Sequence, residues 1–285
     1  MKIRLQGHEK FSLRDGWITK GLMQLSDKPN PVFSSDNAPD VFGIGSNMVK
    51  SLRFWMKAFG LTEDVKGGVV LSEFGRIVKE NDLYLENIFT VWMLHSNLVK
   101  NKETASSWYV FFNNFDLQEF DKETVMNSLS GEMLKLAEDG SKGISQKSLG
   151  SDVDVLLGMY SKNKEFNDPE DKNSSPFAQL GLIKQVEGKK YDRVSPDKRI
   201  INEYLVLFEI AERFETQESV SIDTLLYGEN SLSAIYHMNS LDLNGFLDRL
   251  QDEKYIVVNR TAGLDVIYKD KEISKWEVLE HYYKA

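Results

Sequence analysis

The sequence contains no cysteine, which removes several kinds of chemistry before any motif is considered. Disulfides, zinc sites built on thiolates and cysteine nucleophiles all require this residue, so none of them can occur in this chain. Also absent are the P-loop, the G-x-S-x-G elbow of serine hydrolases, the H-E-x-x-H zinc motif and the dinucleotide glycine fingerprint. The sequence therefore cannot be assigned to nucleotide-binding enzymes, hydrolases or zinc proteases by their common motifs.

Long apolar runs are missing as well. No segment approaches the roughly 20 consecutive apolar residues that a membrane-spanning helix needs. The first residues, MKIRLQGHEKFSLRDGW, lack the apolar core and small-residue cleavage site of a secretory signal peptide. We therefore expect a cytoplasmic protein with no membrane contact.

Charge is distributed unevenly along the chain. The 285 residues are 41% hydrophobic and 28% charged, with a net charge of −9, and this length favours two or three compact units. In residues 1–60, nine lysines and arginines against five acids give +4, so the other 225 residues hold −13. A basic N-terminal part on an acidic chain is typical of a protein that offers one surface to a polyanion.

The segment VFGIGSNMVKSLRFWMKAFGL, residues 41–61, contains three basic residues and no acid. Ser46 can cap a helix that Gly60 would end, so the pattern predicts a helix from about 47 to 59. At 100° per residue its apolar side chains form one core-facing arc. Cations, small hydrogen-bonding groups and an aromatic ring on the opposite side are suited to phosphates and base edges. The residues predicted to bind DNA there are Asn47, Lys50, Ser51, Arg53, Phe54 and Lys57.

The flanks of this helix predict a small domain. Shorter helical patterns precede it, and LTEDVKGGVVLSEF, residues 61–74, predicts a β-hairpin around two glycines. Three helices followed by a hairpin form a winged helix-turn-helix, whose third helix normally lies in the DNA major groove. We therefore predict a basic, DNA-binding winged-helix domain at residues 1–80. Winged helices also serve as protein–protein modules, and that alternative stays open.

Residues 81–165 are rich in aromatic side chains at helical spacing, which predicts a helical middle region whose rings form a core. We expect His95 to be a hydrogen-bonded core residue of this region. The last part of the region, ISQKSLGSDVDVLLGMY, predicts a helix that exposes Gln146, Lys147 and Ser148. The polar segment SKNKEFNDPEDKNSSP, residues 161–176, then predicts a linker.

Residues 166–285 repeat the pattern of three helices and a hairpin, which predicts a C-terminal winged-helix-like domain. Its third helix is mostly acidic and would repel phosphate, so we expect this domain to contact protein. The predicted fold is therefore mainly α with small β-hairpins. It is an α+β arrangement of tandem winged helix-turn-helix domains joined by the helical middle region.

The one compact polar cluster of the sequence lies in GHEKFSLRDGW, residues 7–17. His8 beside the carboxylate of Glu9 could bind a divalent cation or activate water, while Arg14 neutralises charge on a phosphate. These three are the candidate catalytic residues, and Mg²⁺ or Mn²⁺ is the cofactor such chemistry would use. Neighbouring residues on an extended strand point to opposite faces, however. The alternative is that His8 and Glu9 brace the first helix.

Several segments resemble one family. They are GHEKFSLRDGWITKGL, GIGSNMVKSLRFWMKAFGL, LYLENIFTVWMLHSNL and SWYVFFNNF, and they are similar to the SspB-type family of bacterial DNA phosphorothioation defence systems. Many members of that family are catalogued as a domain of unknown function. The resemblance covers residues 6–120, and more loosely the rest. It implies a metal-dependent, DNA-nicking component beside a cysteine desulfurase, an ATP-pyrophosphatase or PAPS-reductase-like enzyme and an ATPase, which together replace a phosphate oxygen with sulfur.

Three functions follow as hypotheses. A DNA-binding component of the phosphorothioation complex would contact double-stranded DNA through the basic helix. A DNA-nicking enzyme would need carboxylates and His8 to converge on a metal ion, and this activity is implied by the resemblance alone. A non-catalytic winged-helix scaffold or transcription regulator would have its basic helix covered by protein.

Overall fold

The computed structural model of the protein describes residues 1–138, 143–161, 175–263 and 265–284. Helices dominate, and the strands form one two-stranded and two three-stranded antiparallel sheets in this part of the chain. These findings confirm the predicted α+β class, mainly α with small β elements, whereas the tandem winged helix-turn-helix arrangement stays a prediction. The chain divides into two compact units, residues 1–194 and 195–285. The finer division at residues 80 and 165 stays a prediction, and nearly all of the predicted linker lies outside the described residues.

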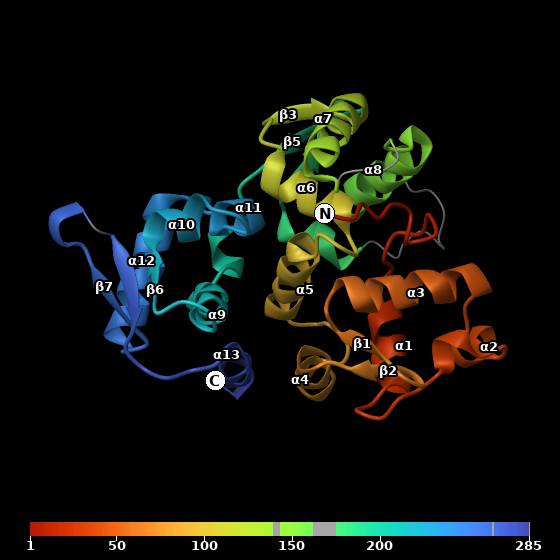
Figure 1. Ribbon diagram of the computed structural model, residues 1–285, viewed down its shortest axis with the longest axis horizontal. Helices are drawn as coiled ribbons and strands as arrows, with labels where there is room; N and C mark the ends of the chain where they lie inside the picture. Colours follow the sequence, from red (N-terminus) through yellow and green to blue (C-terminus); the bar gives the residue numbers. More distant parts are fainter. Residues whose placement is uncertain (139–142, 162–174, 264, 285) are drawn as a thin grey trace. The chain divides into compact units, whose positions relative to one another are not determined.

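The first part of unit 1 contains the basic segment (Figure 1). Its elements are α1 (Trp17–Gln24), a 3₁₀ helix (Val32–Ser34), α2 (Ala38–Phe42), α3 (Ser46–Ala58), β1 (Thr62–Val65), β2 (Gly68–Leu71) and α4 (Glu73–Asn81). Gly43 ends α2 in the left-handed conformation, with φ 62°, and so allows the sharp turn into α3. Gly67 and Gly68 have φ of 98° and 145°, which other residues rarely adopt, and they form the predicted hairpin turn.

The second part of unit 1 is a helical core completed by a small sheet. Its elements are α5 (Ile88–Lys100), α6 (Ser106–Asn114), β3 (Glu119–Asp121), α7 (Lys122–Leu136), α8 (Gln146–Tyr160), a 3₁₀ helix (Pro176–Leu180), β4 (Ile183–Gln185) and β5 (Lys190–Arg193). The sheet order is β3-β5-β4, so strands from both sides of the predicted linker pair within this unit.

Aromatic side chains fill the core of this region, as the sequence predicts. The rings of α5 and α6 that are buried are Phe89, Trp92, Trp108, Tyr109, Phe111 and Phe112. His95 is fully buried among them, and its Nδ1 lies 2.7 Å from the hydroxyl of Tyr160. This contact confirms the prediction of a hydrogen-bonded core histidine. Tyr84 is different, because it precedes α5 and is exposed.

Unit 2 contains a second three-stranded sheet. Its elements are a 3₁₀ helix (Lys198–Ile200), α9 (Glu203–Phe214), β6 (Ser219–Ser221), α10 (Ile222–Tyr227), α11 (Leu232–Tyr236), α12 (Ser240–Asp252), β7 (Ile256–Asn259), a 3₁₀ helix (Thr261–Gly263), β8 (Val266–Lys269) and α13 (Lys275–Lys284). The sheet order is β6-β8-β7. The segment from α9 to β8 repeats the order of elements from α6 to β5 in unit 1: a helix, a strand, further helices and two strands. In both sheets the last of the three strands lies in the middle.

Candidate nucleic-acid interface

Helix α3 presents three cations on one exposed side, and we name Lys50, Arg53 and Lys57 the basic stripe. Their spacing of three and four residues aligns them on one side of the helix. The opposite side anchors α3, because the side chains of Leu52, Trp55, Met56 and Phe59 are fully buried. Burial of such side chains contributes about 1.5–3 kcal/mol each, so the orientation of the stripe is fixed by the core.

Lys50 is the most open member of the stripe. It is exposed, and its Nζ donates a hydrogen bond to Oδ1 of Asn47 at 3.2 Å. Asn47 is exposed as well, one turn earlier on the same side of the helix. The predicted exposure of these two residues is confirmed, and together they offer a cation and an amide to a ligand.

Arg53 and Lys57 share an anionic partner on the hairpin. Arg53 Nη2 donates to Asp64 Oδ1 at 2.8 Å, and Lys57 Nζ donates to Asp64 Oδ2 at 2.6 Å. The hydrogen bonds from Lys57 and then from Arg53 hold the pKa of the Asp64 carboxyl below its usual value. Asp64 therefore offsets part of the positive charge of the stripe at neutral pH.

Ser51 and Phe54 were expected on the exposed side of α3, and this expectation is wrong. Both side chains are buried because the N-terminal segment, residues 1–14, lies against them. Ser51 Oγ donates to the carbonyl oxygen of Phe11 at 3.4 Å. Gly7 approaches Phe54 so closely that an added Cβ would lie 2.5 Å from the ring. A helical wheel treats the helix alone, so it could not detect this covering segment.

The N-terminal segment also brings a cation that the sequence reasoning missed. The guanidinium carbon of Arg4 lies 6.0 Å from the centre of the Phe54 ring, and the Arg4 side chain is exposed. Its backbone N–H donates to Ser106 Oγ at 3.0 Å, which fixes the backbone of this residue against α6. Arg4 therefore lies against α3 through a contact between residues 50 positions apart, for which the sequence gives no local signal.

His8, the first candidate catalytic residue, is fully buried. Its Nε2 lies 3.0 Å from Oδ1 of Asp152, and its Nδ1 accepts a hydrogen bond from the N–H of Lys10 at 3.1 Å. Because Nδ1 is an acceptor, the ring proton is on Nε2 and is donated to Asp152. The imidazole is thus fully engaged in structural hydrogen bonds.

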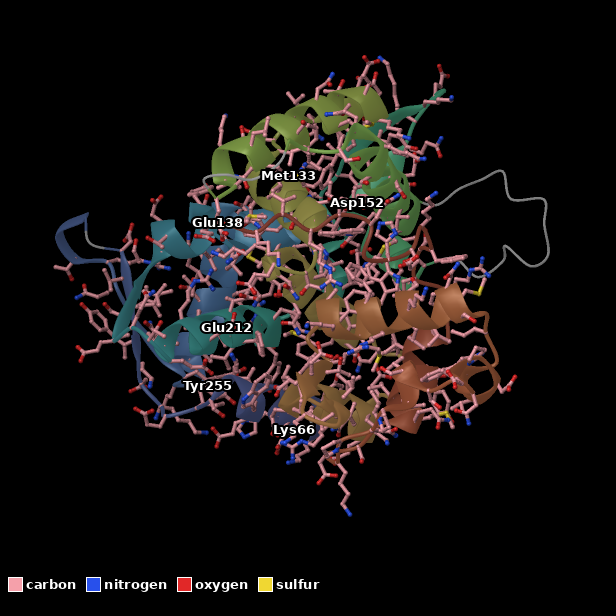
Figure 2. The ribbon with its side chains drawn as sticks, turned by 45° about the vertical axis from the view of Figure 1, so that its right-hand side comes forward. Lys66, Met133, Glu138, Asp152, Glu212 and Tyr255 are labelled. Atoms are coloured by element: carbon pink, nitrogen blue, oxygen red, sulfur yellow. The ribbon has the colours of Figure 1, made fainter. Side chains whose placement is uncertain are left out.

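Asp152 lies on α8 (Figure 2), and its carboxylate is the centre of the hydrogen bonds around His8. Besides His8, its carboxylate accepts from the N–H of Gln6 at 2.8 Å and from Ser107 Oγ at 2.6 Å. Three donors satisfy a buried carboxylate, which otherwise would be costly to bury. The arrangement joins the N-terminal segment to α6 and α8, and it agrees with the interpretation of His8 as a brace.

The other two candidate catalytic residues have surroundings different from those of His8. Glu9 is exposed, with a positive φ of 50°, and the guanidinium carbon of Arg14 lies 5.9 Å from the centre of the Trp17 ring. Among the described residues, no hydrogen bond or ion pair joins His8, Glu9 and Arg14 to one another. The structure therefore does not bring this set together as one site.

A divalent cation in a protein is usually held by clustered carboxylate or imidazole side chains. Within residues 1–138, 143–161, 175–263 and 265–284, no three His, Asp or Glu side chains come together as a possible metal site. Mg²⁺ usually takes carboxylate and water oxygens in an octahedral arrangement. Because one or two carboxylates with several waters suffice for Mg²⁺, the predicted Mg²⁺ or Mn²⁺ stays a prediction, and we derive no metal-dependent step.

A hollow of about 480 Å³ lies between the N-terminal segment, α7 and α8. Its lining includes Lys10, Lys122 and Lys147, and Lys122 pairs with Asp154 at 2.6 Å. Gln146 and Lys147 are exposed as the sequence predicts, whereas Ser148 is half-buried. Unit 1 therefore has a second cationic surface, which the sequence reasoning did not identify because its lysines come from three separate segments.

A family model described as "Protein of unknown function (DUF4007)" matches residues 5–283. Two solved structures, titled "Magnesium ion-bound SspB crystal structure" and "SspB crystal structure", are similar with TM-scores of 0.87 and 0.85. In each case the identity is 24%, and the alignment covers 98% of this chain and 88% of the other.

This similarity shows that the chain has the fold of the two SspB structures, as the resemblance predicted. No curated protein matches the chain. None of the helices in the described ranges is long and apolar enough to cross a bilayer.

Proposed function

The chain belongs to the DUF4007 family and has the fold of SspB, and from this premise we propose that it is a DNA-binding component of a bacterial DNA phosphorothioation system. The observation that carries the DNA-binding part is the basic stripe of Lys50, Arg53 and Lys57 on the exposed side of α3. Phosphate contacts from such cations supply most of the affinity of non-specific DNA binding. The proposed partners are those that the family resemblance implies, a cysteine desulfurase, an ATP-pyrophosphatase or PAPS-reductase-like enzyme and an ATPase.

We propose that α1 to β2 acts as a winged helix with α3 as its recognition helix. The order of three helices and a hairpin, with α3 as the third helix, supports this assignment. The backbone of Asn30 exchanges two hydrogen bonds with the backbone of Val69, which gives the hairpin a third, short strand-like partner. In winged helices the third helix enters the major groove, and Lys50 and Asn47 lie on the side of α3 that would face it.

The C-terminal unit differs in charge, and we propose that it contacts protein. The exposed or half-exposed acids of α12 and its C-terminal end are Asp242, Asp248, Asp252 and Glu253. The basic residues of the same segment are Arg249 and Lys254, so the net charge of this surface is negative. A negative surface repels the phosphate backbone, which favours a protein partner for unit 2.

The proposed function is tested by a salt series on duplex DNA. Each lost phosphate contact flattens the slope of log affinity against log salt by about 0.9, so Lys50→Ala should flatten it by about 0.9. The triple variant Lys50→Ala/Arg53→Ala/Lys57→Ala should flatten it by about 2.7. Fluorescence anisotropy with a labelled duplex at several salt concentrations gives these slopes.

A matched control removes the same charge elsewhere in unit 1. Lys135, Lys184 and Lys189 are exposed and lie outside α3, so their triple alanine variant should leave the slope close to that of the wild-type chain. An unchanged slope in the α3 variant, with a cooperative thermal melt, would exclude α3 as the DNA-binding helix.

A protein scaffold is the second candidate function. The observation that favours it is the burial of Ser51 and Phe54 under the N-terminal segment, which narrows the part of α3 that is open to a ligand. A scaffold would hold its partners whether or not the basic stripe is intact. Co-purification with the other phosphorothioation proteins should then survive the triple alanine substitution of the stripe, whereas binding to duplex DNA should be absent in the wild-type chain.

A further inference from the structure

Asp64 holds two cations of the basic stripe at once. Arg53 Nη2 lies 2.8 Å from one of its carboxylate oxygens, and Lys57 Nζ lies 2.6 Å from the other. Each oxygen therefore accepts from a different cation. A phosphate group offers the same pattern, because two of its non-bridging oxygens can accept from two neighbouring cations.

The three side chains remain open to solvent. Relative exposures are 42% for Arg53, 42% for Lys57 and 41% for Asp64. Water competes with ion pairs at such positions, and pairs of this kind are individually weak. A phosphate of the DNA backbone can therefore replace the carboxylate without a buried charge being left unpaired.

The hairpin determines which of its acids reaches α3. Asp64 and Glu63 are neighbours on β1, and successive residues of a strand point to opposite faces. Asp64 lies opposite Val69 on β2, and the backbone of Val69 exchanges two hydrogen bonds of 3.0 Å with Asn30. Asp64 thus lies on a strand pair that is held in register, whereas Glu63 is exposed and forms no ion pair within the described residues.

We infer that Arg53 and Lys57 form a phosphate-binding site that Asp64 occupies in the free protein and leaves when DNA binds. This inference rests on the proposed DNA-binding function and adds to it a competing ligand built into the hairpin. The free protein keeps its two cations pre-positioned on the carboxylate. Binding then exchanges one anion for another, so Asp64 lowers the affinity for duplex DNA.

Three substitutions separate this role from a general effect of charge. Asp64→Asn removes the competing anion, and it should tighten binding to a labelled duplex by about two- to fivefold, the equivalent of two exposed ion pairs. Glu63→Gln changes the net charge by the same amount on the other face of the strand, and it should change affinity by less than about 1.5-fold. In an Arg53→Ala/Lys57→Ala background, Asp64→Asn should have no effect beyond the same limit.

The outcomes distinguish the phosphate site from the proposed function. If the wild-type chain binds duplex DNA and Asp64→Asn binds no more tightly, the phosphate site is wrong and the proposed function stands. The phosphate site is also wrong if Glu63→Gln gives the same gain in affinity, or if the gain persists without Arg53 and Lys57. General repulsion between the carboxylate and the DNA phosphates would explain both of these results. If neither the wild-type chain nor Asp64→Asn binds, both proposals fail. Asp64→Ser replaces the Asn variant if the latter lacks a cooperative melt.

Discussion

The buried carboxylate of Asp152 is the residue on which the N-terminal segment depends. It accepts hydrogen bonds from Gln6, His8 and Ser107, which belong to two separate parts of the chain. A buried donor that loses its acceptor costs about 1–3 kcal/mol, whereas a satisfied hydrogen bond contributes a net stabilisation of about 0.5–1.5 kcal/mol. All three donors depend on the two carboxylate oxygens of Asp152, so the loss of this one side chain removes every hydrogen bond of the cluster. The cluster therefore holds the N-terminal segment in one position against α6 and α8.

Substitution of Asp152 tests this role. Asp152→Ala leaves three donors without an acceptor, two of them buried, so the free energy of unfolding should fall by about 3–5 kcal/mol in urea denaturation. Asp154→Ala removes an exposed carboxylate two positions along the same helix, and it should cost less than about 1 kcal/mol. Equal losses in the two variants would show that the buried cluster is not a brace.

At the scale of the element, Gly75 on α4 is required by close packing, whereas Gly131 on α7 is not. On α4, a Cβ added to Gly75 would overlap the carbonyl oxygen of Leu61, so only glycine allows this helix to pack against the start of the hairpin. Ser72 fixes the same helix end, because its Oγ accepts from Gly75 N–H and donates to the carbonyl oxygen of Gly60. On α7, a Cβ at Gly131 would meet nothing within 4 Å.

Alanine at these two positions should change stability with opposite signs. Gly75→Ala should lower the free energy of unfolding by about 1–3 kcal/mol, because backbone atoms must move apart. Gly131→Ala should raise it by about 0.5–1 kcal/mol, since alanine favours a helix interior and its methyl group has space. Urea denaturation of both variants measures the two changes, and a loss for both would contradict the packing described for α7.

Arg193 links two elements of unit 1, because its side chain on β5 binds the C-terminal end of α6. Its Nη2 donates to the carbonyl oxygens of Phe111 at 3.1 Å and Phe115 at 2.5 Å. The guanidinium carbon also lies 4.9 Å from the centre of the Phe111 ring. Burial lowers the pKa of Arg193 to about 10, which still leaves the group charged at neutral pH. A cation at the C-terminal end of a helix is favourable for its dipole.

At the scale of the whole molecule, residues 175–194 complete unit 1. Phe177 packs in its core, with ring centres 5.4 Å from Phe59 and 5.5 Å from Tyr160. Strand β5 lies between β3 and β4. A chain that ends before residue 175 would therefore lose part of the core and two strands of the sheet.

Truncation tests this view of the molecule. A fragment of residues 1–194 should melt cooperatively and bind duplex DNA within about twofold of the full chain, because the acidic α12 adds repulsion rather than contacts. A fragment of residues 1–160 should lack a cooperative melt in calorimetry. Loss of DNA binding in a folded 1–194 fragment would show that unit 2 contributes to the interface.

Local sequence patterns determined much of this protein. The spacing of Lys50, Arg53 and Lys57 predicts their common side on α3, and Gly67-Gly68 predicts the hairpin turn. The aromatic density of residues 81–115 predicts a core. These features depend on helical or strand periodicity and on backbone conformation, which are properties of a few consecutive residues.

Only the tertiary structure decided what surrounds the basic stripe. Ser51 and Phe54 have the helical positions of exposed residues, but the N-terminal segment covers them. Asp64 reaches the stripe because the hairpin folds back onto α3, and His8 meets Asp152 across 144 positions of the chain. Periodicity within a helix carries no information about which distant segment packs on it. Burial, charge pairing and hydrogen bonds between such segments are therefore fixed only when the whole unit folds.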